Sequence, residues 1–303
     1  MSPIALPAPI QRRIDATAAD FMRAPGLPEI DFSQPPGEPA LTPAGGVSWR
    51  IFKNPVALFI GGVAAVILEL AEARVRSGVW DHTSFRTEPV ARLRRTGLAA
   101  MVTVYGARSV AEAMIAGVNR MHWRVTGEAD DGRTYAANDP ELLDWVQATA
   151  SYGFGEAYHR FVRPLTPAKR DAAWAEGAEA ARLYGAVGAP TSQAEWEAQL
   201  AAMTPRLTPS PVIFEFLDII RKAPALPGLA RPAVQPLLVR AAVDLTPGAV
   251  RERIGLGPEH GLSGLQARAV ETIARAADRL VLTSSPAAQA SVRMGLPADW
   301  LWR

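Results

Sequence analysis

The sequence contains no cysteine, and this absence removes several kinds of site at once. Disulfides, zinc–thiolate centres, iron–sulfur clusters and thiolate-ligated haem all need a cysteine sulfur, so none of them can form in this chain. Histidine is rare, with 4 in 303 residues, and lysine occurs only at positions 53, 169 and 222. Arginine supplies the other basic residues, which indicates a compositional bias rather than a binding signal.

Strong net charge and long apolar runs are missing too. The formal net charge is +2, too small to indicate nucleic-acid binding by bulk electrostatics. The most hydrophobic stretch, residues 55–68, is interrupted by Glu69 and Glu72 and is too short to span a bilayer. It is typical of a buried helix, although peripheral membrane contact stays open. No apolar run follows the basic residues at 12 and 13, so we expect a cytoplasmic protein without a transmembrane segment.

Helical periodicity dominates what is present. Hydrophobic residues make up 49% of the chain and charged residues 20%, which is typical of a globular protein. Residues 1–45 are rich in proline and glycine and are expected to form an extended arm over the body. Residues 46–303 predict a single, mostly helical, all-α domain with a C-terminal helical subregion after about residue 225.

Most helix starts are marked by a capping residue, a proline or both. These starts are Asn54-Pro55, Glu88-Pro89, Ser109 with Glu112, Asp139-Pro140, Thr166-Pro167, Ser192 with Glu195, and Ser210-Pro211. The run Gly188-Ala189-Pro190 is expected to stop the helix that begins at Pro167. Later helices are expected near 232–244, 264–281 and 286–294.

One polar residue, His122, falls on an apolar helix face. Ala111, Ile115 and Val118 precede it at helical spacing, and Val125 continues the series. A buried imidazole needs a hydrogen-bond partner or a metal. Two interpretations follow: a core histidine bonded to a carbonyl, or a metal ligand, for which neutral imidazole on a haem iron is one form.

A basic cluster lies upstream in the run from Arg92 to Thr96. Arg92 and Thr96 are four residues apart and share a helix face, with Arg95 at its edge. A guanidinium and a hydroxyl together suit a carboxylate, a haem propionate or bound oxygen. The alternative is a solvated basic face without a ligand.

The order of these pieces resembles the catalytic domain family of MpaB and the rubber oxygenases (latex-clearing proteins), over roughly residues 47–295. The matching segments are Asp81 to Phe85, Glu88-Pro89, Arg92 to Thr96, Tyr105-Gly106, His122 with Val125 and Gly127, Tyr135 to Val146, Leu165 to Pro167, Tyr184-Gly185, Leu245 to Pro247, and Arg251 to Gly255. Each segment is short, and the specificity comes from their order and spacing.

The resemblance implies an all-α fold that binds haem b, molecular oxygen and an apolar substrate. By its position in the family motif, His122 would be the proximal iron ligand. Arg92 and Thr96 would lie on the distal side as catalytic residues. His82 matches a family position and would contact the cofactor or only satisfy a hydrogen bond in the core.

Two positions depart from the family pattern. Arg95 stands where some members carry a lysine that can cap the iron, and an arginine cannot give up its proton to do so. Gln147 stands in Trp145-Val146-Gln147 where the family commonly has histidine, and an amide cannot take up a proton. The secretion signal of secreted rubber oxygenases is also missing, so we expect an intracellular member with a smaller substrate. The aliphatic and aromatic residues expected to line the pocket favour an apolar substrate of the alkene or terpenoid kind.

Three functions remain open from the sequence. The first is a haem-dependent oxygenase with Arg92, Arg95 and Thr96 at its catalytic side. The second is a haem- or lipid-binding protein without turnover, which Arg95 and Gln147 favour. The third is a cofactor-free helical interaction protein in which His122 belongs to the core. The remaining histidines, His159 and His260, are expected in a structural position and a solvent-exposed turn.

Overall fold

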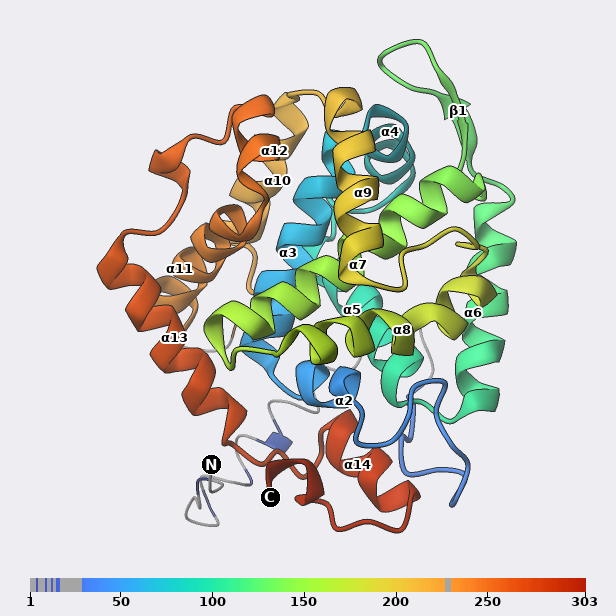
Figure 1. The fold of residues 1–303 in the computed structure, drawn as a ribbon, viewed down its shortest axis with the longest axis vertical. Helices are drawn as coiled ribbons and strands as arrows, with labels where there is room; N and C mark the ends of the chain where they lie inside the picture. Colours follow the sequence, from blue (N-terminus) through green and yellow to red (C-terminus); the bar gives the residue numbers. More distant parts are fainter. Residues whose placement is uncertain (1–3, 5–8, 10–11, 13–14, 17–28, 227–229) are drawn as a thin grey trace.

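Figure 1 shows a computed structural model of the chain, in which residues 29–226 and 230–303, with residues 4, 9, 12, 15 and 16, are described. This part of the chain forms thirteen α-helices and one small hairpin, which confirms the all-α fold. The helices are α2 (Val47–Phe52), α3 (Pro55–Ala71), α4 (Ala73–His82), α5 (Pro89–Tyr105), α6 (Arg108–His122), α7 (Pro140–Phe161), α8 (Pro167–Tyr184), α9 (Gln193–Met203), α10 (Pro211–Lys222), α11 (Ala230–Leu245), α12 (Gly248–Arg253), α13 (Gly264–Asp278) and α14 (Pro286–Arg293). The hairpin pairs β1 (Thr126–Glu128) with β2 (Thr134–Ala136) in antiparallel register.

The centre of the molecule is the crossing of α3 and α7, around which the other helices are arranged (Figure 1). Gly61 and Gly153 lie at the crossing, where a Cβ on either residue would collide with the backbone of the other. Two glycines let the helix backbones approach this closely. Trp145 is fully buried beside the crossing and donates its Nε1 proton to the carbonyl of Leu68, 3.3 Å away.

Side-chain caps fix several helix starts as the sequence predicts. Asn54 accepts hydrogen bonds from the backbone N–H groups of Val56 and Ala57 at 3.1 and 2.9 Å. Asp139 caps α7 through the N–H of Glu141, at 2.9 Å. Thr166, Ser192 and Ser210 cap α8, α9 and α10 in the same way. Each cap satisfies N–H groups that have no partner inside the helix.

Three local expectations were wrong. Ser109 does not cap α6, which begins one residue earlier at Arg108; its own N–H instead donates to the carboxylate of Glu38 at 2.6 Å. The helix that begins at Pro167 ends at Tyr184, and its stop is Gly185, which adopts a left-handed conformation with φ +92°, and not the expected run at Gly188. The α6 helix ends at His122, so Val125 lies beyond it, in the approach to β1.

The described part of the arm, from residue 29 onward, runs without helix to α2 and packs against α14. Phe32 and Leu41 are buried there. Arg293 of α14 donates to the carbonyl oxygens of Phe32 and Glu38, at 2.7 and 2.8 Å. Most of residues 1–28 lie outside the described residues, so the division of the chain at about residue 45 stays a prediction.

Within the described residues, no single helix has the length and apolar character needed to cross a membrane. Only α3 and α4 taken together pass that criterion, and they are bent by 112° relative to each other. The cytoplasmic location expected from the sequence stays a prediction, which cell fractionation tests.

Candidate functional site

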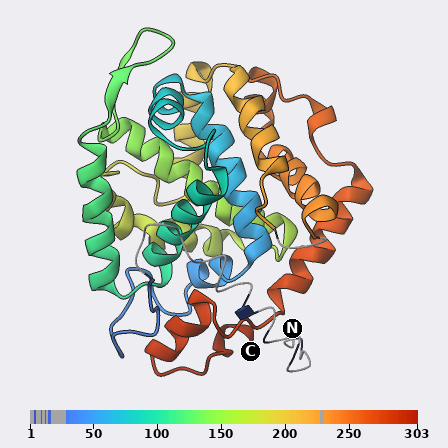
Figure 2. The same cartoon turned by 180° about the vertical axis from the view of Figure 1, so that it is seen from behind.

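The predicted site residues come from α4, α5 and α6, on the face seen in Figure 2; α4 packs against α3, and α5 packs against α6. In that view α5 runs diagonally between α3 and α6. Proline at the first position of α5 sets its start, and Glu88 precedes it. Arg92 therefore lies one turn into α5, and His122 is the last residue of α6.

His122 is half-buried, and its Nδ1 atom is buried without a hydrogen-bond partner among the described residues. Burial lowers the pKa of this imidazole, and the positive charge of Arg92 lowers it further. The ring is thus held neutral at neutral pH. A neutral imidazole with an unpartnered nitrogen is the form that binds a metal.

Arg92 is half-buried beside two groups of different character. Its guanidinium carbon lies 5.6 Å from the ring centre of Phe85. Burial lowers the pKa of Arg92, and the nearby carboxylate of Glu69 partly offsets this effect. The Nε atom of Arg92 is buried without a partner in the described part of the chain. The cation remains protonated and has donor capacity left for an anion.

Glu69, in the last turns of α3, has a pKa shifted toward neutral pH. Dense packing around its carboxyl raises the pKa to about 7, with Arg92 and Thr149 acting in the opposite direction. The hydroxyl of Thr149 lies 3.4 Å from Glu69 Oε1 and 2.9 Å from the carbonyl of Val146. One hydroxyl proton serves one acceptor, so a protonated Glu69 can donate to the oxygen of Thr149.

Arg95 and Thr96 occupy different surroundings from Arg92. Arg95 donates to the hydroxyl of Ser84 at 2.8 Å and lies 4.0 Å from the carboxylate of Glu88. The side chain of Thr96 is exposed, and its hydroxyl donates to the carbonyl of Arg92 at 3.0 Å. The structure thus does not bring Arg95 or Thr96 into contact with His122, and their catalytic role stays a prediction.

The hydrogen bonds of His82 and Gln147 go to residues other than His122. His82, the last residue of α4, is exposed and shares a hydrogen bond of 3.0 Å with the hydroxyl of Tyr135 in β2. Gln147 is 3.4 Å from the hydroxyl of Ser151 and lies on the side of α7 that meets α8 at Gly177. His82 thereby joins α4 to the hairpin, and its predicted contact with a cofactor stays untested.

Three aromatic side chains, Trp80, Phe85 and Phe216, form a wall beside Arg92. Trp80 and Phe85 stack with ring centres 6.3 Å apart, and Phe85 meets Phe216 edge-on at 5.5 Å. The indole nitrogen of Trp80 and the hydroxyl of Thr83 are buried without partners among the described residues. Unpartnered buried polar atoms are uncommon in folded proteins and mark places that need an explanation. Here several of them gather along α4, α5 and α6.

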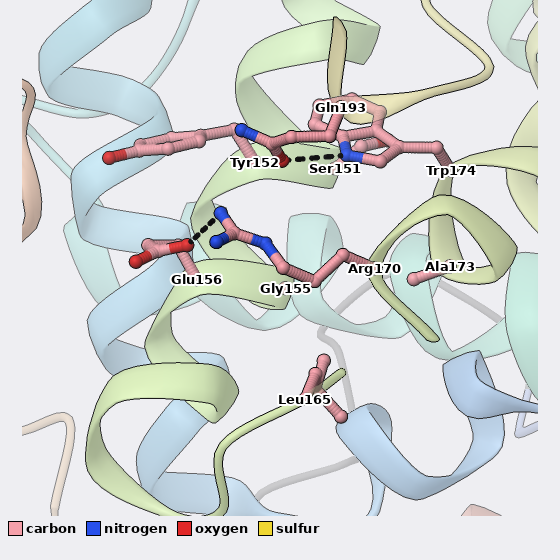
Figure 3. A pocket seen from close by; sticks show the side chains of 9 residues that line it. All are labelled: Ser151, Tyr152, Gly155, Glu156, Leu165, Arg170, Ala173, Trp174 and Gln193. Atoms are coloured by element: carbon pink, nitrogen blue, oxygen red, sulfur yellow. Dashed lines mark hydrogen bonds and ion pairs between the residues drawn. The ribbon is translucent and has the colours of Figure 1, made fainter. Parts of the chain in front are cut away.

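A small cavity lies elsewhere, between α7, α8 and α9 (Figure 3). Its volume is about 20 Å³, which holds roughly one water molecule. Glu156 and Arg170 form an ion pair of 2.7 Å across it, and Trp174 donates to Gln193 at 3.3 Å. These polar groups satisfy one another, so the cavity has the character of a packing defect rather than of a substrate site.

Among the described residues, no three His, Asp or Glu side chains gather into a group that could hold a metal ion. His122 is therefore a lone candidate ligand.

Comparison with known proteins decides the family. The family described as "ER-bound oxygenase mpaB/B'/Rubber oxygenase, catalytic domain" matches residues 49–280 of this sequence, more than half of the chain. The chain belongs to this family. No curated protein and no solved structure matches it. Membership of the mpaB/rubber oxygenase family supports oxygenase activity in general terms.

Sequence reasoning missed two residues of this region. Glu69 entered only as an interruption of the apolar run at 55–68, and Thr149 was not singled out. The available signal was a single carboxylate directly after Leu68 in a helix whose other faces are apolar. Their proximity to Arg92 depends on how α3, α5 and α7 pack, which no local pattern encodes.

Proposed function

We propose that this chain is a haem b-dependent oxygenase that acts on an apolar small molecule, with His122 as the residue that would ligate the iron. The observation that carries the proposal is the buried Nδ1 of His122, which has no partner among the described residues. Family membership supports the oxygenase part of the proposal. The cofactor, the ligand and the substrate class are our inference.

The donor set fits a haem. A haem iron would take a ligand from the protein, and the neutral imidazole of His122 would supply it. The carboxylate groups of a haem need cations, and Arg92 keeps a positive charge and an unpartnered Nε. Trp80 and Phe85 offer buried aromatic surface next to Arg92. A bound haem would supply the iron at which molecular oxygen is activated.

The protein's own contribution is to bind, orient and control protons. His122 would bind the iron through an imidazole ring that burial and the charge of Arg92 keep neutral. Arg92 orients an anionic group, and its positive charge favours the ionised form of Glu69 against the effect of burial. Glu69, with a pKa of about 7, can hold a proton at its carboxyl or release it near neutral pH. The apolar wall around Phe85 restricts water.

The proposal is tested by an absorption spectrum after reconstitution with haemin. The wild type is expected to show a Soret band, and His122→Ala is expected to lose it while keeping its far-ultraviolet circular dichroism. His260→Ala is the matched control, because His260 ends the short 3-10 helix Pro258–His260, away from α4, α5 and α6 in the sequence, and pairs with Glu259 at 3.2 Å. Full haem retention in His122→Ala rejects the assignment.

Arg95 makes a second measurement informative. An arginine stays protonated and cannot ligate the iron, so cyanide and imidazole should bind the resting protein without displacing a side chain. Arg95→Lys is expected to slow that binding, and Thr96→Val is expected to keep the haem while changing the spectrum of the cyanide complex. A resting spectrum with two protein nitrogen ligands contradicts this arrangement.

Substrate oxidation separates this function from a haem- or lipid-binding protein without turnover. Gln147, in place of the usual family histidine, is the residue that favours the alternative. Oxygen uptake by the loaded protein with alkene and terpenoid probes, but not without them, supports the oxygenase. Haem binding without oxygen uptake for any probe supports the alternative.

A further inference from the structure

We infer that the C-terminal end of α6 is a docking surface for an anionic lipid bilayer. Two large apolar side chains lie there on either side of His122. The exposed fractions of Met121 and Trp123 are 61% and 71%. An isolated exposed apolar residue is ordinary, but a tryptophan and a methionine around one helix end form a paired apolar tip.

The charges around this tip have one sign. Arg120 and Arg124 are exposed and directly flank Met121-His122-Trp123. Neither forms an ion pair or a side-chain hydrogen bond with any described residue. By contrast, Arg108 at the other end of α6 pairs with Glu179 at 2.6 Å. The two tip arginines therefore keep their full charge for an external anion.

Neighbouring carboxylates do not cancel this charge. The hairpin that follows α6 carries Asp130 and Asp131, and both are engaged. Asp130 pairs with Arg76 at 2.7 Å, and Asp131 pairs with Arg133 at 2.6 Å. Glu128, which is exposed in β1, is the carboxylate of the hairpin that pairs with none of the described residues.

The shape of the molecule makes the tip accessible to a plane. The α6 helix runs along one edge of the molecule, and its end points toward the corner from which the hairpin projects (Figures 1 and 2). The outward side of α6 continues from the tip with Ala113 and Ala116, both exposed. A helix edge with small apolar residues, tryptophan and arginine suits the headgroup region of a bilayer.

Lipid is favoured over a protein partner because of the tip's chemistry. Tryptophan places an apolar ring and a polar N–H at the same depth, and arginines beside it meet phosphate and serine headgroups. The docking would bring His122 next to a phase in which apolar substrates dissolve. Only this last consequence rests on the proposed function; the docking itself does not.

The test is co-sedimentation of the full chain with vesicles at low salt. Vesicles of phosphatidylcholine with about one third phosphatidylserine are compared with pure phosphatidylcholine. The wild type is expected to bind the anionic vesicles more strongly and to be released by salt. Trp123→Ser is expected to lower the partition by about tenfold on the anionic vesicles. The double variant Arg120→Gln, Arg124→Gln should reduce anionic binding to the phosphatidylcholine level.

The matched control is Leu265→Ser, since Leu265 is 80% exposed at the start of α13, far along the chain from the tip. It should bind as the wild type does. Binding by Trp123→Ser equal to that of the wild type overturns the inference, as does absence of wild-type binding to anionic vesicles. A dimer in sedimentation velocity that Trp123→Ser dissolves would also overturn it, in favour of a second copy. Loss of haem by His122→Ala with unchanged vesicle binding would show that the two proposals stand separately.

Discussion

The α3–α7 crossing and the α4–α6 layer differ in how completely their polar groups are satisfied. At the crossing, Trp145 and the two helix N-termini all find partners, and neither α3 nor α7 contains a buried side-chain polar atom without a partner. In the neighbouring layer, Trp80, Thr83, Arg92, Asn119 and His122 each keep such an atom. Both regions belong to one fold, yet only at the crossing do all buried side-chain polar atoms have hydrogen-bond partners.

The difference indicates that the crossing serves mainly the stability of the fold, whereas the α4–α6 layer is the region suited to bind a ligand. A satisfied, close-packed crossing supplies stability, because apolar burial and hydrogen bonds both favour the folded state there. A layer of unsatisfied groups costs stability unless a ligand or solvent completes it. Glu69 and Thr149 stand at the boundary, since they come from α3 and α7 but lie toward Arg92.

The largest effect is expected at the crossing itself. Gly153→Ala places a Cβ against the carbonyl of Gly61, where backbone and not a flexible side chain would have to move. We expect a loss of about 3 kcal/mol in the free energy of unfolding, measured by urea denaturation. Gly155→Ala is the control two residues away on α7, where a Cβ meets nothing within 4 Å. It should stabilise the helix by about 0.5–1 kcal/mol, and equal effects of the two variants would contradict the close approach.

The second effect tests the boundary carboxyl. Because the pKa of Glu69 is raised from 4.5 to about 7 in the folded state, the folded chain binds more protons than the unfolded chain between these values. Its contribution to stability is therefore lost as pH rises from about 5 through 7, by up to about 3 kcal/mol. Glu69→Gln should remove this decline in denaturation curves measured across pH.

The control for Glu69→Gln is Glu128→Gln, which changes an exposed carboxylate in β1. Its stability should follow the wild type across the same pH range. If Glu69→Gln also runs parallel to the wild type, the carboxyl is ionised throughout, and the boundary between the two regions lies elsewhere.

A third test compares two half-buried histidines near helix ends. His159 in α7 accepts a hydrogen bond from the N–H of Leu165 at 2.9 Å, whereas Nδ1 of His122 has no partner among the described residues. His159→Leu should cost about 1–2 kcal/mol, and His122→Leu should leave the haem-free protein unchanged or more stable. Calorimetry of both proteins would measure this.

The comparison of the two histidines also predicts how stability changes at acidic pH. Burial lowers the pKa of His122, so the wild type loses stability as pH falls below the ordinary histidine value of about 6.5. His122→Leu should lack this component. A loss of stability in His122→Leu as large as that in His159→Leu would mean that His122 is a satisfied core residue.

The smallest effect is expected for Thr96→Val. The side chain is exposed and its hydroxyl bonds only to the carbonyl of Arg92 in its own helix. The change in unfolding free energy should stay within about 0.5 kcal/mol. A larger loss in thermal denaturation would show that Thr96 contacts a neighbouring element and belongs to the layer's interior.

Local sequence determined the helices and most of their starts. Asn54, Asp139 and Thr166 cap because their short polar side chains reach N–H groups two or three residues ahead, and a fixed proline conformation follows each of them. These interactions span a few residues and are readable from the chain. The order of motifs also indicated the family, which the match over residues 49–280 established.

Tertiary structure decided what the local pattern could not. The start of α6 depends on Glu38, a residue far away along the chain, and not on Ser109 with Glu112. Arg92 and Thr96 share a helix face by spacing, yet packing half-buries one and exposes the other. Glu69 of α3 interacts electrostatically with Arg92 of α5, a contact between residues that are far apart in the sequence. Spacing fixes directions around one helix axis, whereas burial and charge contacts depend on which helices surround it, and those contacts link residues far apart in the sequence.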